Sequence, residues 1–232
     1  MATDASMNQQ VSADVSTCFG VFILFTLIYT ILKCIFGIIG DKLWSSGYLL
    51  MTIIIQWQLN SMIAKDNCDG VDQIQTVALA TLLPWVGIFG LMHLLLLMFP
   101  GWKSPFSNTL GYLIAYMTGV NKAFFALLDT PEGINKTSQG DKALIKSIEY
   151  LYSDASLMIN EMTPENFEDA MVRLEPMMNE EAKSNPSLKK ELYKHIITKD
   201  AIGEFVWLIL SGSMAINIAF STIINSTCET TI

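Results

Sequence analysis

The stretch Glu204–Ile224 (EFVWLILSGSMAINIAFSTII) decides the fold class of this chain. As a helix it would be about as long as a bilayer is thick, and it has no ionisable residue after Glu204, a pattern typical of a transmembrane helix. Two further stretches, Cys18–Ile39 and Val77–Phe99, are also nearly continuously apolar. Soluble domains break their apolar residues with charge every few positions. The sequence therefore predicts an all-α, polytopic membrane protein.

The composition supports this class and limits the partners. Hydrophobic residues make up 51% of the chain and charged residues 16%, whereas soluble domains carry roughly 25% charged residues. The charges are scarce up to about Ala126, crowd into Asp129–Asp200 and, apart from Glu204, are absent again until Glu229. The formal net charge of -8 and the lack of basic clusters argue against a nucleic-acid partner. The pattern indicates a membrane part that is interrupted by one polar insert.

The expected parts follow from this distribution of charge. They are a polar N-terminal segment, a membrane region, a helical extramembrane insert, a last transmembrane helix and a tail, over residues 1–17, 18–128, 129–202, 203–225 and 226–232. Within the membrane region we expect three transmembrane helices and then an amphipathic helix at the interface or against the bundle. Their expected ranges are 18–39, 47–64, 77–99 and 109–128. Together with the last transmembrane helix, 203–225, the three in the membrane region make about four transmembrane helices in the prediction.

The second of these helices is ambiguous, because Gln56, Gln58 and Asn60 follow its apolar start. Such side chains cannot face lipid cheaply, although they can pack against another helix. We interpret residues 47–64 as a span, and a re-entrant or interfacial segment is the alternative. In the third helix, Pro84 predicts a kink because proline removes one backbone hydrogen bond.

Two ionisable side chains fall inside the apolar stretches. Lys33 lies about two turns from the end of the first stretch, so we expect its ammonium group to snorkel to the headgroups. A buried functional cation is the alternative. His93 is interpreted as a histidine hydrogen-bonded to a neighbour near the interface. Its alternative, a gating or proton-carrying role, would need carboxylates at membrane depth.

The polar insert shows helical patterning. Thr163-Pro164-Glu165 and Ser184-Asn185-Pro186 are helix start signals. Apolar residues at helical spacing predict the buried faces of three amphipathic helices: Leu144, Ile148, Leu151, Ala155 and Met158; Phe167, Met171, Leu174 and Met178; Leu188, Leu192 and Ile196. We interpret the methionines as core residues, with an adaptable contact surface as the alternative. Glu168, Glu175 and Glu191 are candidate contacts for a partner protein.

Lysine placement predicts the orientation in the membrane. If all four candidates span, Lys42, Lys103 and the insert share one side, which the positive-inside rule assigns to the cytoplasm. The Cys68 loop and the carboxyl tail then share the opposite side, where oxidising conditions allow a disulfide between Cys68 and Cys228.

Motifs for catalysis are not visible. The chain has no G-x-S-x-G, H-E-x-x-H or Walker sequence, and its cysteines and histidines lack metal-binding spacing. We therefore expect no enzyme, no cofactor and no metal site. The chain also lacks a selectivity filter and visible inverted repeats, which disfavours a channel or transporter subunit. That class remains the alternative, with Gln56, Gln58, Asn60 and His93 as its only candidates for a polar path.

Two sequence blocks carry a family resemblance. The first comprises Leu82–Trp85 (LLPW) and Phe99–Tyr112 (FPGWKSPFSNTLGY). The second begins with Lys199–Trp207 (KDAIGEFVW), continues through Ser211-Gly212 and closes at Cys228. Together they resemble membrane-embedded structural proteins, of the minor-capsid or inner-membrane kind, from large icosahedral DNA viruses related to algal viruses and mimivirus.

The resemblance implies a structural protein in the internal membrane of a virion, beneath the capsid shell. Such membranes derive from the host endoplasmic reticulum, and their former cytoplasmic face looks toward the capsid. The expected partners are the lipid bilayer, other capsid or minor capsid proteins and copies of the chain itself. The insert, expected in the cytoplasm, would then face the capsid and serve viral assembly.

Overall fold

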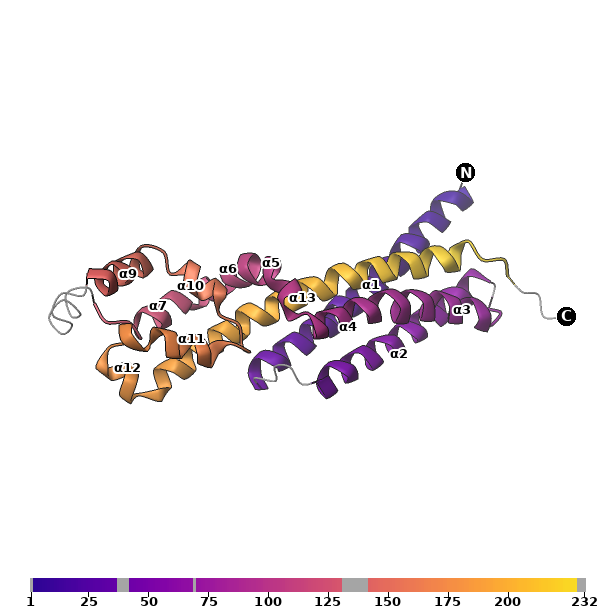
Figure 1. Cartoon of the computed structure of the whole chain (residues 1–232). Helices are drawn as coiled ribbons and strands as arrows, with labels where there is room; N and C mark the ends of the chain where they lie inside the picture. The colour runs from indigo at the N-terminus through magenta and orange to yellow at the C-terminus, as the bar shows by residue number, and fades with distance from the viewer. Residues whose placement is uncertain (1, 37–41, 69, 131–141, 229–232) are drawn as a thin grey trace. The chain divides into compact units, whose positions relative to one another are not determined.

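A computed structural model describes residues 2–36, 42–68, 70–130 and 142–228 of the chain (Figure 1). Within these ranges the chain is helical, apart from turns and one isolated antiparallel bridge between Leu128 and Met178. The prediction of an all-α fold is confirmed. The contacts divide the chain into two compact units. The first unit comprises Met1–Leu32, Gly40–Trp102 and Phe205–Ile232, and the second comprises Lys33–Ile39 and Lys103–Glu204.

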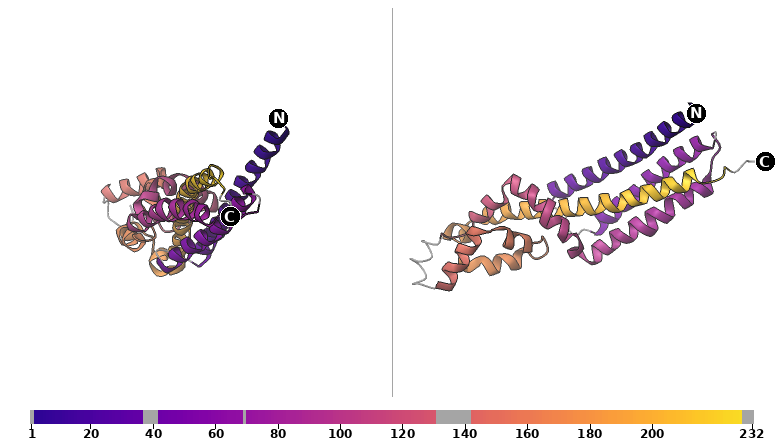
Figure 2. Two further views of the ribbon diagram at one scale, coloured as in Figure 1. Left: turned by 90° about the vertical axis from the view of Figure 1, so that its right-hand side faces the viewer. Right: turned by 90° about the horizontal axis from the view of Figure 1, so that it is seen from above.

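Long apolar helices build the first unit. Its elements are α1 (Ala2–Phe36), α2 (Lys42–Asn67), α3 (Ile74–Thr81), η1 (Leu82–Gly90), α4 (Leu91–Met98) and the part of α13 (Pro186–Ile224) from Phe205 onward. These elements lie side by side in Figures 1 and 2. Three segments are long and apolar enough to cross a membrane: Val15–Phe36, Ile74–Met98 and Pro186–Ile224. They contain most of the expected spans 18–39, 77–99 and 203–225.

The ends of these helices differ from the expected ranges. The structure describes α1 as one helix from Ala2 onward, so the expected N-terminal polar segment, 1–17, continues directly into the first span. The expected end of that span, 37–39, lies outside the described residues, as does the end of the tail, 229–232. At the other end of the chain, the helix expected after Pro186 and the last span form the single helix α13.

The position of Pro84 explains why the third span is not a regular α-helix. Proline lacks a backbone N–H, and its ring clashes with the carbonyl one turn earlier. The chain accommodates Pro84 in the π-helical element η1, whose turn is wider. Trp85 and Phe89 from this element are fully buried, and each ring packs edge-on against Phe22, with centroid distances of 5.5 and 5.8 Å.

Helix α2 buries its polar side chains within the first unit. Ser45, Thr52, Gln56 and Asn60 follow one face and are buried, while Gln58 is exposed. Asn60 Nδ2 donates to Thr81 Oγ1 at 2.9 Å. The helix has 26 residues, or about 39 Å at 1.5 Å per residue, more than the roughly 30 Å hydrocarbon core. Helix α2 is long enough to span, but it is not among the described segments that are also apolar enough to do so, and the interpretation of 47–64 as a span stays a prediction.

Short helices build the second unit around the residues of α13 that precede Phe205. They are η2 (Pro100–Lys103, ending in this unit), α5 (Ser104–Phe106), η3 (Ser107–Gly111), α6 (Tyr112–Thr118), α7 (Val120–Phe125), α9 (Lys142–Ser153), α10 (Ser156–Glu161), α11 (Phe167–Leu174), η4 (Glu175–Met177) and α12 (Glu180–Ser184). Most of the predicted inward residues are buried: Ile148, Leu151, Ala155, Phe167, Met171, Leu174, Met178, Leu192 and Ile196. Met158 and Leu188 are partly buried, and the side chain of Leu144 lies outside the part of the chain that the structure describes. The insert thus has its own apolar core.

Of the two helix starts predicted in the insert, one is confirmed and the other is wrong. Helix α13 begins at Pro186, and Asn185 Oδ1 accepts from the backbone N–H of Ser187 at 3.1 Å. Helix α11 begins at Phe167, later than the expected start at Thr163. Thr163 and Asn166 instead accept hydrogen bonds from each other's backbone N–H, at 3.3 and 2.7 Å. This reciprocal pair closes a turn before the helix can begin.

The prediction of one amphipathic helix over 109–128 is wrong, because the segment is divided into separate helical elements. Gly119 adopts φ of +107° and separates α6 from α7, a backbone conformation that glycine tolerates best. The second part of the segment, including Val120 and Phe124, is buried in the core of the second unit. Leu113 and Met117 of the first part are exposed. The second compact unit therefore includes residues before 129, from Lys103 onward, while the bounds of the extramembrane insert stay a prediction.

Candidate functional site

A cluster of four charged side chains lies buried in the second unit. Lys33, Lys103, Asp200 and Glu204 are each no more than 7% exposed. Asp200 and Glu204 stand one turn apart on α13, so their carboxylates share a face. Lys103 Nζ lies 2.5 Å from Asp200 Oδ2 and 3.8 Å from Glu204 Oε2, and Lys33 Nζ pairs with Glu204 Oε2. Two cations and two anions thus neutralise each other away from solvent.

The environment keeps Lys103 charged. Burial alone would lower the pKa of its ammonium group, but the carboxylates of Asp200 and Glu204 outweigh burial and raise the pKa above its usual value. A buried ion pair loses much hydration energy, and its mutual attraction offsets that loss only when the geometry is good. The cluster therefore holds its segments in one arrangement, because a displaced partner would leave a charge buried alone.

A third lysine next to the cluster binds carbonyl oxygens. Lys199 is 1% exposed, and its Nζ donates to Asn108 Oδ1 at 3.0 Å and to the backbone oxygen of Asn160 at 3.3 Å. The polar contacts of Lys199 thus fix α13 to η3 and to the end of α10. This link complements the ion pairs on the neighbouring turn.

Two glycines allow α13 to approach η3 closely. A Cβ atom added at Gly111 would collide with the backbone oxygen of Lys199. A Cβ atom added at Gly203 would lie 2.5 Å from Ser107 Oγ and 2.7 Å from its backbone nitrogen. Backbone segments in such contact leave no room for any side chain. Consequently, the sequence 107–111 and the sequence 199–203 form one closely packed seam.

This seam joins the two sequence blocks that carry the family resemblance. Lys103, Ser107 and Gly111 belong to the first block, and Lys199 to Glu204 begins the second. A similar pairing occurs in the first unit, where Trp102 packs against Trp207 with a centroid distance of 6.2 Å. Segments about 100 positions apart in sequence, such as Lys103 and Asp200, which are separated by 97, are therefore structural partners.

The favoured interpretation of Lys33 is wrong. Its ammonium group does not reach outward but pairs with buried Glu204, because a carboxylate is available at the start of the last apolar stretch. The sequence contained the signal, since the two spans end and begin with opposite charges. His93 is 2% exposed, and its Nε2 lies 2.7 Å from Ser45 Oγ. This contact agrees with the interpretation of a hydrogen-bonded histidine.

The cysteine pair expected to form a disulfide is joined in the structure. Cys68 and Cys228 are bonded, with their Cα atoms 5.5 Å apart. Both belong to the first unit, Cys68 directly after α2 and Cys228 after α13. The disulfide links the carboxyl end of α2 to the carboxyl end of α13.

The candidate partner contacts Glu168, Glu175 and Glu191 are all exposed. Glu168 and Glu175 are seven positions apart at α11 and η4, with exposed Val172 between them. Residues at this spacing lie on one side of a helix. Met162, Met171 and Met178 are buried, so the methionines of the insert serve its core, as the favoured interpretation holds.

Among the described residues, no group of three or more His, Cys, Asp or Glu side chains has the arrangement of a metal site. Comparisons of the chain with protein-family models, with curated proteins and with solved structures found no match. The arrangement of the cluster can therefore be interpreted from its chemistry alone. Its charged groups are buried and mutually paired, which suits a structural role.

Proposed function

We propose that this chain is a structural membrane protein that anchors or links the internal membrane of a virion to its capsid shell. The observation that carries the proposal is the seam between the two resembling blocks. Its charged residues are buried and paired, and its glycines allow backbone contact. Residues of that kind hold a fold together and leave little for a substrate to reach. The viral setting rests on the family resemblance.

The disulfide supports the orientation. Two candidate spans, Ile74–Met98 and the last part of α13, lie between Cys68 and Cys228 in sequence. An even number of crossings returns the chain to the same side, so the insert between these spans lies on the opposite side. Disulfides persist in oxidising compartments. The insert would therefore face the cytoplasm and, in a virion, the capsid.

The insert offers an acidic exterior for docking. Glu168, Glu175 and Glu191 are exposed on a compact unit with its own core. Such carboxylates attract basic patches of a partner and mainly raise the association rate and fix its orientation. Capsid proteins or neighbouring copies of the chain with basic surfaces would fit this exterior.

Charge reversal tests the docking. The triple variant Glu168→Lys, Glu175→Lys and Glu191→Lys should insert into membranes normally but enter assembled particles less efficiently. The cause is lost electrostatic attraction, so the difference from the unchanged chain should shrink as salt increases. A control variant reverses Glu149, Glu161 and Glu181, which are also exposed but lie on α9, α10 and α12. It has the same net charge and should assemble normally.

The amount of each variant in purified particles, measured by quantitative mass spectrometry, decides the outcome. Equally reduced incorporation of both triple variants would show that net charge and not these three positions matters. Normal incorporation of the first variant would reject docking through this face. Cross-linking mass spectrometry on native particles would identify the partner.

A channel or transporter subunit is the second candidate. The buried polar face of α2 favours it, because Ser45, Thr52, Gln56 and Asn60 follow one inward face of this helix. However, Ser45 contacts His93 and Asn60 contacts Thr81, which fits interhelical hydrogen bonding. Ion flux in liposomes that is lost in Gln56→Leu would support this candidate, whereas the absence of flux would support the structural role.

A further inference from the structure

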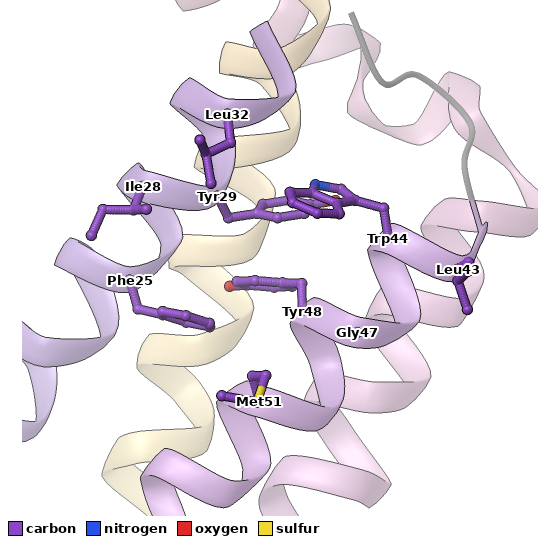
Figure 3. A pocket seen from close by; sticks show the side chains of 9 residues that line it. All are labelled: Phe25, Ile28, Tyr29, Leu32, Leu43, Trp44, Gly47, Tyr48 and Met51. Atoms are coloured by element: carbon purple, nitrogen blue, oxygen red, sulfur yellow. The ribbon is translucent and has the colours of Figure 1, made fainter. Parts of the chain in front are cut away.

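An apolar groove of about 370 Å³ lies between α1 and α2 in the first unit (Figure 3). The buried rings of Tyr29 and Tyr48 line its inner side and stack with a centroid distance of 4.2 Å. Phe25 stacks on Tyr48 at 5.5 Å, and Trp44 stacks on Tyr29 at 6.5 Å. An engineered cavity of about 150 Å³ suffices to bind benzene. The groove is therefore large enough for an elongated apolar ligand.

The groove is lined by the edges of this stack of rings and by aliphatic side chains, and the hydroxyl of Tyr48 beside it is already hydrogen-bonded. The hydroxyl of Tyr48 is hydrogen-bonded to Thr26 Oγ1 at 2.8 Å, so its polar end is already satisfied within the helix pair. At the rim, Ile28 and Met51 are 47% and 48% exposed. The surface that a ligand would meet is thus apolar and aromatic. Such a surface binds hydrocarbon through many weak dispersion contacts.

The location of the groove identifies the solvent around it. Its α1 residues lie within the candidate span Val15–Phe36, where the surroundings are lipid tails. At one end of the groove are Leu43 and Trp44, the latter a residue type typical of the membrane interface. Lys42, directly before Leu43, is exposed. A cation beside the interfacial end of an apolar groove complements a lipid phosphate.

We infer that this groove binds one acyl chain of an anionic glycerophospholipid, whose headgroup contacts Lys42. The acyl chain lies along the edges of the stacked rings, between Ile28 of α1 and Met51 of α2. The lysine supplies the preference for an anionic over a zwitterionic headgroup. This lipid site is independent of the proposed docking function, because it involves only α1 and α2.

Gly47 provides a direct way to fill the groove. It lines the groove, and a Cβ atom added there would meet nothing within 4 Å. Gly47→Leu should therefore project its side chain into the ligand's space from an unhindered Cβ position. Gly20 of α1 is also exposed and open, but it does not line the groove. Gly20→Leu is the matched control.

Native mass spectrometry of the full chain tests the site. The protein is reconstituted into bilayers with equal amounts of phosphatidylglycerol and phosphatidylcholine and is then released into mild detergent. The unchanged chain and Gly20→Leu should each retain one phosphatidylglycerol, and Gly47→Leu should retain none. Lys42→Ala should reduce the preference for phosphatidylglycerol about fivefold, because one surface lysine contributes on the order of 1 kcal/mol.

Several results would overturn the inference. Retention of phosphatidylglycerol by Gly47→Leu, or its loss from Gly20→Leu as well, would place the lipid elsewhere. Equal retention of both lipids by the unchanged chain would exclude the anionic preference. A dimer that dissociates in Gly47→Leu would show that a second copy occupies the groove. Unchanged helicity and melting temperature of the variant exclude misfolding as the cause.

A fluorescence measurement gives an independent readout on the unchanged chain. Phosphatidylglycerol with brominated acyl chains should quench Trp44, which lines the groove. The quenched component is the one removed by Trp44→Phe. Quenching of Trp44 that persists in the Gly47→Leu variant would contradict the inference.

Discussion

At the scale of single residues, the buried charges show how this protein uses polar groups inside an apolar environment. Lys103 lies between two carboxylates, and Lys33 reaches Glu204 from another segment. Removing one member of a buried ion pair costs more stability than replacing both members by apolar residues, since the remaining charge has lost both water and its partner. Single and double substitutions in the cluster therefore measure how strongly its ion pairs stabilise the packing of these segments.

Lys103→Met should destabilise the second unit by about 3–5 kcal/mol, because Asp200 is left buried without its cation. The double variant Lys103→Met with Asp200→Leu should recover most of this loss, since neither charge remains. Thermal unfolding in detergent, followed by circular dichroism, measures both. Lys183→Met is the control: Lys183 pairs with Glu180 on the surface, and its loss should leave the melting temperature unchanged. A single variant as stable as the double variant would contradict the role of the pair.

At the scale of elements, the contact between η3 and α13 depends on small residues. Gly203→Ala should destabilise the second unit by about 1–3 kcal/mol, because the added methyl group meets the backbone of Ser107 and one helix must shift. Gly87→Ala is a suitable control, since a Cβ atom there meets nothing within 4 Å. Thermal unfolding of both variants measures the difference. Equal melting temperatures would show that the two elements are not in contact.

The disulfide is the covalent link between elements of the first unit. Cys68→Ser should lower the stability of this unit by about 2–5 kcal/mol, because the unfolded chain loses a long closed loop. Peptide mapping without reductant should find Cys68 joined to Cys228 in the unchanged chain. Cys34, which is not disulfide-bonded, serves as the control, and Cys34→Ser should leave the bridge intact. Unbridged thiols at positions 68 and 228 would refute the link.

At the scale of the whole molecule, the core of the insert extends beyond the residues that the sequence assigns to it. The insert has its own core, which includes Val120 and Phe124 from before residue 129. A deletion of residues 129–202 alone would expose these apolar side chains. Charge reversal on the insert is therefore a cleaner test of docking than its removal.

A protease added to sealed vesicles tests the topology. Sites between Asp129 and Asp200 should be cut only when the cytoplasmic face is outside, because the lysine asymmetry predicts that the insert is on that side. The disulfide region should be protected in the same vesicles. Opening the vesicles with detergent is the control and should expose both regions. Cleavage of the insert from the lumenal side alone would reject the orientation.

The sequence by itself determined the fold class, the three apolar spans, the inward faces of the insert and the cysteine pair to consider. These follow from local periodicity, composition and crossing number, which need no knowledge of distant neighbours. Only the tertiary structure decided that Lys33 pairs with Glu204 and that Gly111 and Gly203 form a seam. It also decided that α7 belongs to the insert's core. The physical reason is that these contacts join segments far apart in the chain, so no local pattern encodes which partner each side chain meets.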